Sequence, residues 1–382
     1  MKSVEIFAGA GGLALGLERA GFEPMALFEN DHLSCSTLAH NRPQWDILEE
    51  DVRNVDFRKF KNVDLLSGGP PCQPFSVGGI SRGSGDRRDM FPQALRAVSE
   101  MLPRAFVFEN VGGLLRPSFR SYIEYIKLSL ALPLFHLEPK VPQEKQLVYL
   151  QKAVAAHPFS ASETYKVGIY LIQAADYGVP QHRRRVFIVG FRGDVLTDSL
   201  FPSPTHSRNS LLESKWGDGS YWKDHSIPPP RTRPSAHFFS PSRPTAPRPP
   251  GSTLARWRTV RDALSDLPHP KSRHSYLNHE YHAGAKIYPG HTGSQWDEPS
   301  KTIKSGVHGV PGGENMIAHG NGRVRYFSVR EAARIQTFPD EYFFNAQWSE
   351  AMRQVGNAVP VALAEQIGNF VFRTLERKSL AI

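Results

Sequence analysis

A chain of 382 residues, 40% of them hydrophobic, is long enough for a large domain with a second, smaller one and apolar enough for a real core. Its 46 Lys and Arg outnumber its 37 Asp and Glu, and its two cysteines exclude a disulfide-stapled secreted scaffold. No run of about 18 apolar residues occurs, and a strand-like run begins almost at Met1. We therefore expect a cytoplasmic protein with no signal peptide and no membrane contact.

The N-terminal segment predicts a strand, a glycine turn and a helix. Val4–Phe7 is strand-like, Ala8–Gly12 forms the turn, and the amphipathic stretch Leu13–Ala20 ends at Gly21. Glycines let the backbone approach a ligand closely, and a helix N-terminus favours negative charge. The spacing is not G-x-G-x-x-G, so plain strand–helix packing stays an alternative.

A second apolar run ends at Phe28 and is followed by Glu29, Asn30 and Asp31. An acidic residue at the end of the second strand of such a unit suits hydrogen bonds to ribose hydroxyls. Glu29 is therefore a candidate ligand for a nucleoside.

The most informative motif is Pro70-Pro71-Cys72-Gln73. It follows the apolar run Val63–Leu66 and the small residues Ser67–Gly69, which predicts a buried strand ending in a rigid turn with a thiol at its tip. A thiol in that position suits nucleophilic attack. A small buried apolar cysteine is the alternative.

Two further strand ends carry polar residues. Ala105–Phe108 leads into Glu109, and the arginines 183 to 185 precede the apolar run Val186–Gly190. Ligands of open α/β sheets bind outside the carboxyl ends of the strands, so Cys72, Glu109 and the glycine turn should meet at one edge. Arg183 and Arg185 alternate and should share a face, although a solvated surface cluster is the alternative.

Positive charge is concentrated between residues 201 and 325, where 17 Lys and Arg stand against 9 Asp and Glu. Ten of the fifteen histidines also lie there. Such an excess is the expected footprint of phosphate contacts, with the proline-rich stretch 207–251 predicted to be flexible. His274, His279 and His282 lack supporting cysteines and a regular spacing, so no metal site is predicted.

Six motifs in this order resemble those of the DNA cytosine-C5 methyltransferase family, of the bacterial type II modification type. They are Phe7–Gly12, Pro70–Ser76, Glu109–Val111, Gln181–Arg185, Arg330–Gln336 and Gln354–Pro360. The resemblance runs from the first strand to about Gly368. Glu5 stands where an Asp is common in the family and Ala358 where a Ser is common, and neither change removes a group that the chemistry needs.

The resemblance implies an α/β fold, a doubly wound and mostly parallel sheet of the S-adenosylmethionine-dependent, Rossmann-like type, with a second, smaller DNA target-recognition domain. Residues 1–195 with 350–382 would form a discontinuous catalytic domain, 196–325 the recognition domain and 326–349 a hinge region. Residues 130–168 form a partly helical insertion to which no role is assigned.

The resemblance also implies a covalent mechanism. Cys72 would add as a thiolate to carbon 6 of cytosine and make carbon 5 nucleophilic. Glu109 would supply a proton at N3, Arg185 would hold O2, and Arg183 would support the loop or a phosphate. The methyl donor would be S-adenosyl-L-methionine.

This chemistry cannot take place inside a stacked duplex, so the base must be flipped out of the helix. The glycine-containing loop from Gln73 to Phe91 would close over it. Three of its residues are candidate DNA contacts that could fill the gap left by the base, namely Ser76, Ser81 and Arg82.

By position in the motifs, Phe7 would stack near the adenine, Glu29 would bind the ribose, and Asp51 with Val52 would bind the adenine edge. A strand-end Asp is often only a turn residue, which is the alternative for Asp51. The complete set of expected cofactor contacts is Phe7, Gly9, Ala10, Gly12, Glu29, Asn30, Asp51, Val52, Gly69, Pro71, Asn357, Ala358 and Val359.

The expected partner is double-stranded DNA, with a cognate restriction endonuclease acting on the same site as a possible companion, and the chain is expected to be a monomer. Two alternatives remain open. A tRNA cytosine-C5 methyltransferase would share the motifs, although the large basic segment favours DNA. A catalytically inactive DNA-binding module is disfavoured by the intact Cys72, Glu109, Arg183 and Arg185.

Overall fold

The computed structural model describes residues 1–71, 89–135, 141–156, 160–195, 197–231, 254–289, 292–305, 315–320 and 322–379. The chain divides into two compact units, and each is discontinuous. The first comprises Met1–Ile172, Arg184–Pro202 and Ala364–Ile382, and the second comprises Gln173–Arg183 and Ser203–Leu363. No helix in the described part of the chain is both long and apolar enough to cross a membrane.

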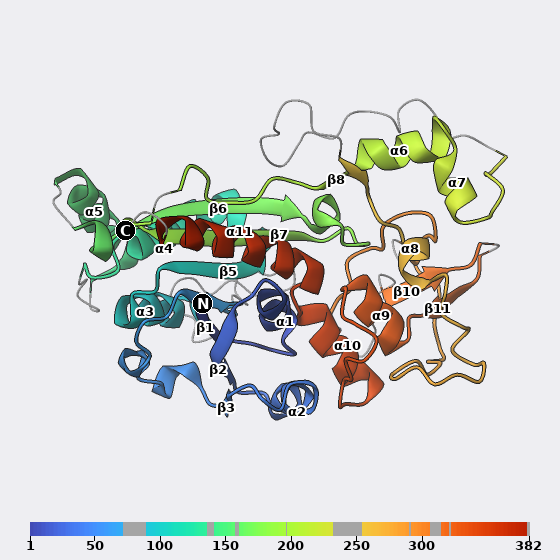
Figure 1. The fold of residues 1–382 in the computed structure, drawn as a ribbon, viewed down its shortest axis with the longest axis horizontal. Coiled ribbons are helices and arrows are strands. Elements are labelled where there is room, and N and C mark those ends of the chain that lie inside the picture. The colour runs from blue at the N-terminus through green and yellow to red at the C-terminus, as the bar shows by residue number, and fades with distance from the viewer. Residues whose placement is uncertain are drawn as a thin grey trace. The chain divides into compact units, whose positions relative to one another are not determined.

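A seven-stranded sheet forms the centre of the first unit (Figure 1). Its order is β3-β2-β1-β4-β5-β7-β6, in which the pairs from β3 to β5 are parallel and β5 pairs with β7 antiparallel. The predicted mostly parallel α/β sheet is therefore confirmed. The strands are β1 (Lys2–Ile6), β2 (Glu23–Glu29), β3 (Ile47–Glu49), β4 (Leu65–Gly68), β5 (Ala105–Val111), β6 (Tyr165–Gln173) and β7 (Arg184–Arg192).

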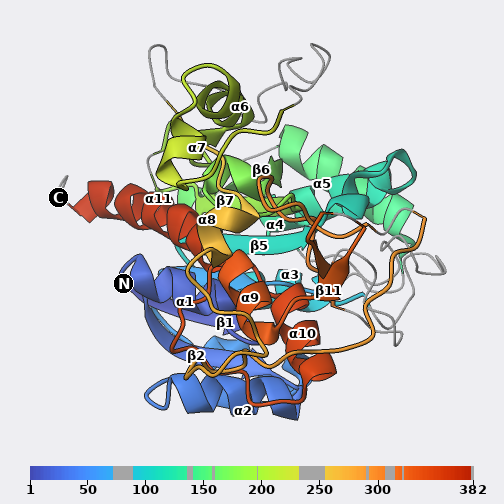
Figure 2. The same ribbon diagram turned by 90° about the vertical axis from the view of Figure 1, so that its right-hand side faces the viewer.

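Helices cover both faces of this sheet (Figure 2). Alternate residues such as Val4, Ile6 and Phe108 face α3 and α4, which contribute Val98 and Ile126 to the same core. On the other face α11 packs beside α1. The helices of this unit are α1 (Gly12–Arg19), α2 (His32–Asn41), α3 (Phe91–Met101), α4 (Arg120–Ala131), α5 (Gln143–Ala156) and α11 (Val361–Ser379), with short 3-10 turns η1 (Val52–Asn54), η2 (Phe57–Lys59), η4 (Gly112–Leu115), η5 (Pro117–Phe119) and η6 (Ala161–Glu163).

The contact between α11 and α1 depends on a small residue. A methyl group at Gly368 would come within 2.7 Å of Cβ of Ala20, so glycine lets the two helices approach closely. Phe22 and Phe372 meet edge to face nearby, with their ring centroids 5.4 Å apart. The C-terminal segment is therefore part of the first unit from Ala364 onward.

The second unit is built from short elements. Two small sheets pair β8 with β9 in parallel and β10 with β11 antiparallel. A separate aromatic core joins Tyr221, Trp222 and Trp257. Its elements are η7 (Ala174–Tyr177), β8 (His206–Ser207), α6 (Arg208–Trp216), α7 (Ser220–Asp224), β9 (Ala255–Arg256), α8 (Val260–Leu264), β10 (Met316–Ala318), β11 (Val324–Tyr326), α9 (Val329–Ile335) and α10 (Trp348–Asn357).

Most predicted elements occur with shifted ends. The helix expected over Leu13–Ala20 spans Gly12–Arg19, and a capping box of Ser328 and Glu331 opens α9. Strand β5 runs on to Val111, so Glu109 lies within the strand and not beyond it.

The division into units differs from the domain bounds expected from the sequence. Residues 173–183 and 350–363 belong to the second unit, because main-chain bonds such as those between Pro180 and Ser300 tie the first of these segments to it. The segment 326–349, expected as a hinge, also lies in that unit. The assignment of DNA-sequence recognition to one of the units stays a prediction.

Glu5 is an acidic residue in the middle of β1, with only 4% of its surface exposed. Its Oε2 accepts a hydrogen bond from Oγ of Ser67 on β4 at 3.1 Å. Burial raises the pKa of Glu5 from 4.5 to about 8, opposed by hydrogen bonds from Ser67 and the main chain of Ala14. The folded protein therefore holds this proton at neutral pH.

Replacing Glu5 with Gln should change how stability depends on pH. Between pH 4.5 and about 8 the folded chain binds one more proton at Glu5 than the unfolded chain. The stabilisation is present below the lower value and is lost as the pH rises towards the upper one. The side chain of the Glu5→Gln variant has no such proton to lose. Urea unfolding from about pH 5 to about pH 9 should therefore show a shallower fall of the free energy of unfolding with pH for the variant than for the wild type. Parallel profiles for the two proteins would contradict this account.

Candidate active site

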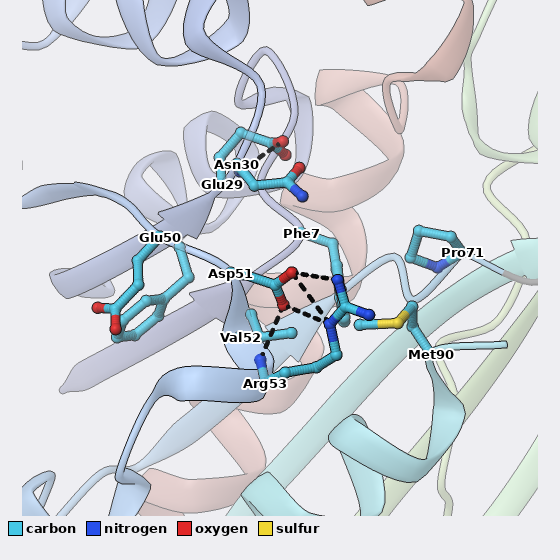
Figure 3. A pocket seen from close by; sticks show the side chains of 10 residues that line it. Phe7, Glu29, Asn30, Glu50, Asp51, Val52, Arg53, Pro71 and Met90 are labelled. Atoms are coloured by element: carbon cyan, nitrogen blue, oxygen red, sulfur yellow. Dashed lines mark hydrogen bonds and ion pairs between the residues drawn. The ribbon is translucent and has the colours of Figure 1, made fainter. Parts of the chain in front are cut away.

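A cavity of about 120 Å³ opens in the first unit at the carboxyl ends of β1, β2 and β4 (Figure 3). Six of the predicted cofactor contacts line it, namely Phe7, Glu29, Asn30, Asp51, Val52 and Pro71. Four lining residues were missed from the sequence, namely Phe28, Glu50, Arg53 and Met90. Of these four residues, only Arg53 belongs to a recognisable sequence pattern, an Asp-x-Arg triplet that recurs five residues later.

Glu29 fixes the glycine turn to the end of β2. Its Oε2 accepts a hydrogen bond from the main-chain nitrogen of Gly9 at 2.8 Å, and its Oε1 accepts from those of Asn30 and Asp31, both at 2.9 Å. A carboxylate has about four acceptor sites, so one remains for a further donor. The site therefore presents a rigid acceptor to whatever enters the cavity.

Phe7 reaches the cavity through an unusual backbone conformation. Its φ is 57°, a left-handed value that a bulky side chain rarely adopts. Such strain is concentrated at functional sites. The next residues of the turn do not line the cavity. Gly9 lies where a methyl group would meet nothing within 4 Å, and Ala10 and Gly12 are buried at the start of α1.

Asp51 caps the 3-10 turn η1 and binds Arg53. Its side chain accepts from the main-chain nitrogen of Arg53 at 3.0 Å, and both carboxylate oxygens lie 3.0 Å from Nε of the same residue. These hydrogen bonds hold the pKa of Asp51 below its usual value. Asp51 therefore has the turn role that was its alternative and also lines the cavity, and its contact with the adenine edge stays a prediction.

The Pro-Pro turn after β4 is held by β5. Nδ2 of Asn110 donates to the carbonyl oxygen of Pro70 at 2.9 Å, and the nitrogen of Met90 donates to the carbonyl of Pro71 at 3.0 Å. A methyl group built on Gly69 would lie 3.8 Å from Oε2 of Glu109. Glu109 therefore lies beside the turn that leads into Cys72, and the expected meeting of Cys72, Glu109 and the glycine turn stays a prediction.

Glu109 is paired with Arg185 across β5 and β7. Its Oε1 lies 2.8 Å from Nε of Arg185 in a buried ion pair. Both side chains are largely buried, and burial lowers the pKa of the Arg185 guanidinium while the charge of Glu109 and its hydrogen bond oppose that effect. The pair therefore offers a carboxyl group and a guanidinium side by side to a substrate.

Arg183 has a different set of partners, within the second unit. Its guanidinium donates to the carbonyl oxygens of Ile303 at 3.2 Å, Gly356 at 2.9 Å and Ala358 at 3.0 Å. It therefore fastens the segment around Asn357 to the stretch that contains Ile303. Its expected role beside Arg185 on one face stays a prediction.

The same segment is locked by two glutamines. Nε2 of Gln336 donates to the carbonyl oxygens of Val355 and Ala358, and Nε2 of Gln181 donates to Oε1 of Gln336 at 2.8 Å. A methyl group at Gly356 would come within 2.5 Å of the main chain of Lys304, so only glycine fits there. Three of the sequence motifs thus interlock in this unit and fix Asn357, Ala358 and Val359.

Four predicted site residues lie outside the described part of the chain, namely Cys72, Ser76, Ser81 and Arg82. The other cysteine, Cys35, is buried on α2. Burial and the nearby carboxylates of Glu29, Glu49 and Asp31 raise the pKa of its thiol to about 12. The thiol of Cys35 is therefore held in its protonated form, which makes it a poor nucleophile.

Comparison with known proteins places this geometry in a family. The model of the C-5 cytosine-specific DNA methylase family matches residues 1–146 and 153–373. The type II methyltransferase M.PspPI of Psychrobacter sp. is 34% identical over 377 residues, which cover 97% of this chain and 79% of that protein. The type II methyltransferase M.NgoMIV of Neisseria gonorrhoeae is 32% identical over 386 residues, 99% of each.

Solved structures of low sequence identity share the fold. The S. pombe Dnmt2 methyltransferase has a TM-score of 0.58 and 14% identity, and the alignment covers 98% of this chain and 99% of that one. The Entamoeba histolytica methyltransferase EhMeth has a TM-score of 0.55 and 12% identity, with 98% of each chain covered. The family match over nearly the whole chain and the relatives of 34% and 32% identity establish that the chain belongs to the C-5 cytosine-specific DNA methylases and is a DNA cytosine methyltransferase.

Proposed function

We propose that the chain transfers a methyl group from S-adenosyl-L-methionine to carbon 5 of a cytosine flipped out of a specific duplex sequence, through a covalent bond between Cys72 and carbon 6. The observation that carries the proposal is Glu109. Its carboxyl group is buried beside the turn that leads into Cys72 and is ion-paired with Arg185. The edge of a cytosine ring offers an amino donor and ring acceptors, which a carboxyl group and a guanidinium can bind.

The chemistry follows from the electron demand of the ring. Carbon 5 of cytosine is a poor nucleophile until the Cys72 thiolate bonds to carbon 6 and breaks the conjugation. The electron pair displaced towards N3 is neutralised by a proton that Glu109 delivers to that nitrogen. Carbon 5 now behaves as an enamine carbon and accepts the methyl group. Loss of the carbon-5 proton to a base and departure of the thiolate restore the double bond, and the N3 proton returns to Glu109.

Arg185 is well placed to support both steps. Its Nε lies 2.8 Å from Oε1 of Glu109 and so orients that carboxyl group, and the guanidinium can also hold the O2 oxygen of the ring. Because the pair is buried, these contacts are worth more than at the surface.

The residues around the cavity fit S-adenosyl-L-methionine. Glu29 is a rigid acceptor for ribose hydroxyls, and Phe7, Val52 and Pro71 offer apolar surface to an aromatic ring. When bound, the cofactor supplies an electrophilic methyl group. Asn357, Ala358 and Val359 are proposed to complete its site.

Duplex DNA is proposed to bind the second unit, which carries most of the excess positive charge. Four large apolar side chains are exposed within one short segment, namely Leu277, Tyr281, Ile287 and Tyr288. Nζ of Lys271 lies 4.1 Å from the centroid of the Tyr281 ring. An aromatic side chain with a cation beside it suits contact with bases and phosphate together.

This segment is anchored and is not a loose loop. His279 is fully buried, with its Nδ1 2.7 Å from Oγ of Ser328 and its Nε2 2.8 Å from the carbonyl of Pro268. The ring of His282 stacks on Trp348 at 3.8 Å. Tyr281 lies between these two fixed residues and its side chain is partly exposed.

A role in restriction–modification is proposed by likeness to the type II relatives.

The covalent mechanism predicts a trapped complex on a duplex that carries 5-fluorocytosine at the target position. Fluorine replaces the removable proton of carbon 5, so elimination stalls after methyl transfer. Protein and DNA should then migrate together on a denaturing gel, and Cys72→Ala should form no such complex. Glu109→Gln should slow its formation, because an amide cannot deliver the proton.

Cys35→Ala is the matched control for the trapping experiment and should give the full amount of complex, because Cys35 is buried with a raised pKa. Methylation of ordinary cytosine without any trapped complex would point to transfer at the exocyclic amine. Stronger trapping on a tRNA that carries 5-fluorocytosine than on the duplex would favour the RNA enzyme.

The DNA-binding surface predicts a specific change in salt dependence. Lys271→Ala should lower the slope of log affinity against log salt by about 0.9, the value for one lost phosphate contact. Tyr281→Ala should weaken binding about tenfold, as expected for an aromatic contact. Fluorescence anisotropy with a labelled duplex at several salt concentrations measures both. Tyr149→Ala on α5, where the side chain is 48% exposed against 38% for Tyr281, is the control and should bind as the wild type does.

A further inference from the structure

The Pro-Pro turn that leads into Cys72 is bonded to the residues just before α3. The main-chain nitrogen of Met90 donates to the carbonyl oxygen of Pro71 at 3.0 Å, and Asn110 of β5 donates to that of Pro70 at 2.9 Å. Both carbonyl oxygens of the turn are therefore held by donors from other segments of the chain. Cys72 is the next residue in the sequence.

Asp89, the neighbour of Met90, is fastened to two helices. Its Oδ1 accepts a hydrogen bond from the main-chain nitrogen of Phe91, the first residue of α3, at 3.1 Å. Its Oδ2 accepts from the hydroxyl group of Tyr122 on α4. The rings of Phe91 and Tyr122 meet edge to face, with their centroids 6.4 Å apart. One carboxylate thus joins α3 and α4 at the residue that precedes Met90.

The two hydrogen bonds of Asp89 have different explanations. A carboxylate at the N-terminus of a helix satisfies a main-chain donor and faces the positive end of the helix dipole, so local structure accounts for the bond to Phe91. Tyr122 lies 33 residues away in the chain, and its ring is part of the core of the first unit. Phenylalanine would supply the same ring to that core. The core therefore needs the ring of Tyr122, whereas its hydroxyl group acts on Asp89.

These contacts form a continuous path from α4 to the turn. Tyr122 fixes the carboxylate of Asp89, the chain continues directly to Met90, and the nitrogen of Met90 fixes the carbonyl of Pro71. Pro71 and Met90 also line the same cavity (Figure 3). A hydrogen bond to a charged acceptor is about twice as strong as a neutral one, so the bond from Tyr122 is the firmest link in this path.

We propose that Tyr122 and Asp89 are positioning residues for methyl transfer, which hold the Pro-Pro turn so that the Cys72 thiolate meets carbon 6 of the target cytosine. They act through Met90 and Pro71 and not by contact with the base. This inference rests on the proposed role of Cys72 as the nucleophile. Misplacement of a reacting group by about 1 Å costs on the order of 100-fold in rate, so a bond that fixes the turn contributes to the reaction.

Tyr122→Phe tests the proposal through the rate of trapping on a duplex that carries 5-fluorocytosine. With S-adenosyl-L-methionine and duplex both saturating, the variant should form the covalent complex about tenfold more slowly than the wild type, the order expected when a hydrogen bond to a charged group is lost. The Kd for S-adenosylhomocysteine, measured by calorimetry, should stay at the wild-type value, because Phe7, Glu29 and Val52 still line the cavity.

Tyr165→Phe is the matched control. The hydroxyl group of Tyr165 donates to the carbonyl oxygen of Pro103, and its ring packs in the same core as that of Tyr122. Each variant loses one hydroxyl hydrogen bond and keeps its ring, so thermal unfolding should show similar losses of stability for the two. Only Tyr122→Phe should slow the trapping reaction.

Asp89→Asn is the second variant and keeps the size of the side chain. It replaces a charged acceptor with a neutral one, so it should also slow trapping. The double variant of Tyr122→Phe and Asp89→Asn should be no slower than the slower of the two single variants, because both changes act on the same bond. Rate losses that multiply in the double variant would show that the two residues act independently, and would contradict the proposal.

Three further results would overturn the inference. Equal slowing by Tyr122→Phe and Tyr165→Phe would mean that any loosening of the core lowers the rate. A rise in the Kd for S-adenosylhomocysteine as large as the loss of rate would mean that the pair shapes the cavity and not the position of the nucleophile. Trapping by Tyr122→Phe at the wild-type rate would overturn this inference alone, whereas a wild-type protein that formed no trapped complex would overturn the proposed covalent mechanism with it.

Discussion

The first unit depends on one carboxylate that is bonded to the main chain. Glu29 accepts from three backbone nitrogens, and these belong to the glycine turn after β1 and to the residues that follow β2. Hydrogen bonds to a charged acceptor are stronger than neutral ones, and a buried donor without a partner would be costly. The two turns are thereby fixed to one another, and Phe7 is held in its strained conformation at the mouth of the cavity.

The chemistry is assembled by the order of the strands. Because β7 enters the sheet antiparallel to β5, Glu109 lies opposite Phe187 and Val111 lies opposite Arg185. Glu109 and Arg185 are therefore diagonal neighbours on one face, close enough to pair. Asn110, on the other face of the same strand, holds the Pro-Pro turn. Strand β5 thus carries the proposed acid, Glu109, and the next residue, Asn110, supports the turn before the proposed nucleophile.

In the second unit, side-chain donors bond to main-chain carbonyl oxygens, which is the reverse of the arrangement at Glu29. Arg183 and Gln336 donate to main-chain carbonyls on both sides of Asn357, and Gly356 leaves no room for a side chain. Buried donors of this kind must be satisfied, so the loop has few alternative conformations. The buried donors of these motifs thus have a structural role, because they determine where the main chain runs.

The sequence by itself determined the fold class, the motifs and the residue types of the site. Apolar runs that end in Glu29, in Pro70-Pro71 or near Glu109 mark strand ends, and strand ends of a parallel sheet meet at one edge. Tertiary structure alone decided the pairings. Arg183 and Arg185 stand two residues apart in the chain but have different partners. Arg185 pairs with Glu109 because β7 lies beside β5, and Arg183 bonds to the main chain of the second unit. Likewise the two Asp-x-Arg triplets read alike in the sequence, and only packing puts Arg53 in the wall of a cavity. Local pattern fixes which groups a segment carries, whereas contacts between residues far apart in the chain depend on strand order and packing, which local pattern does not encode.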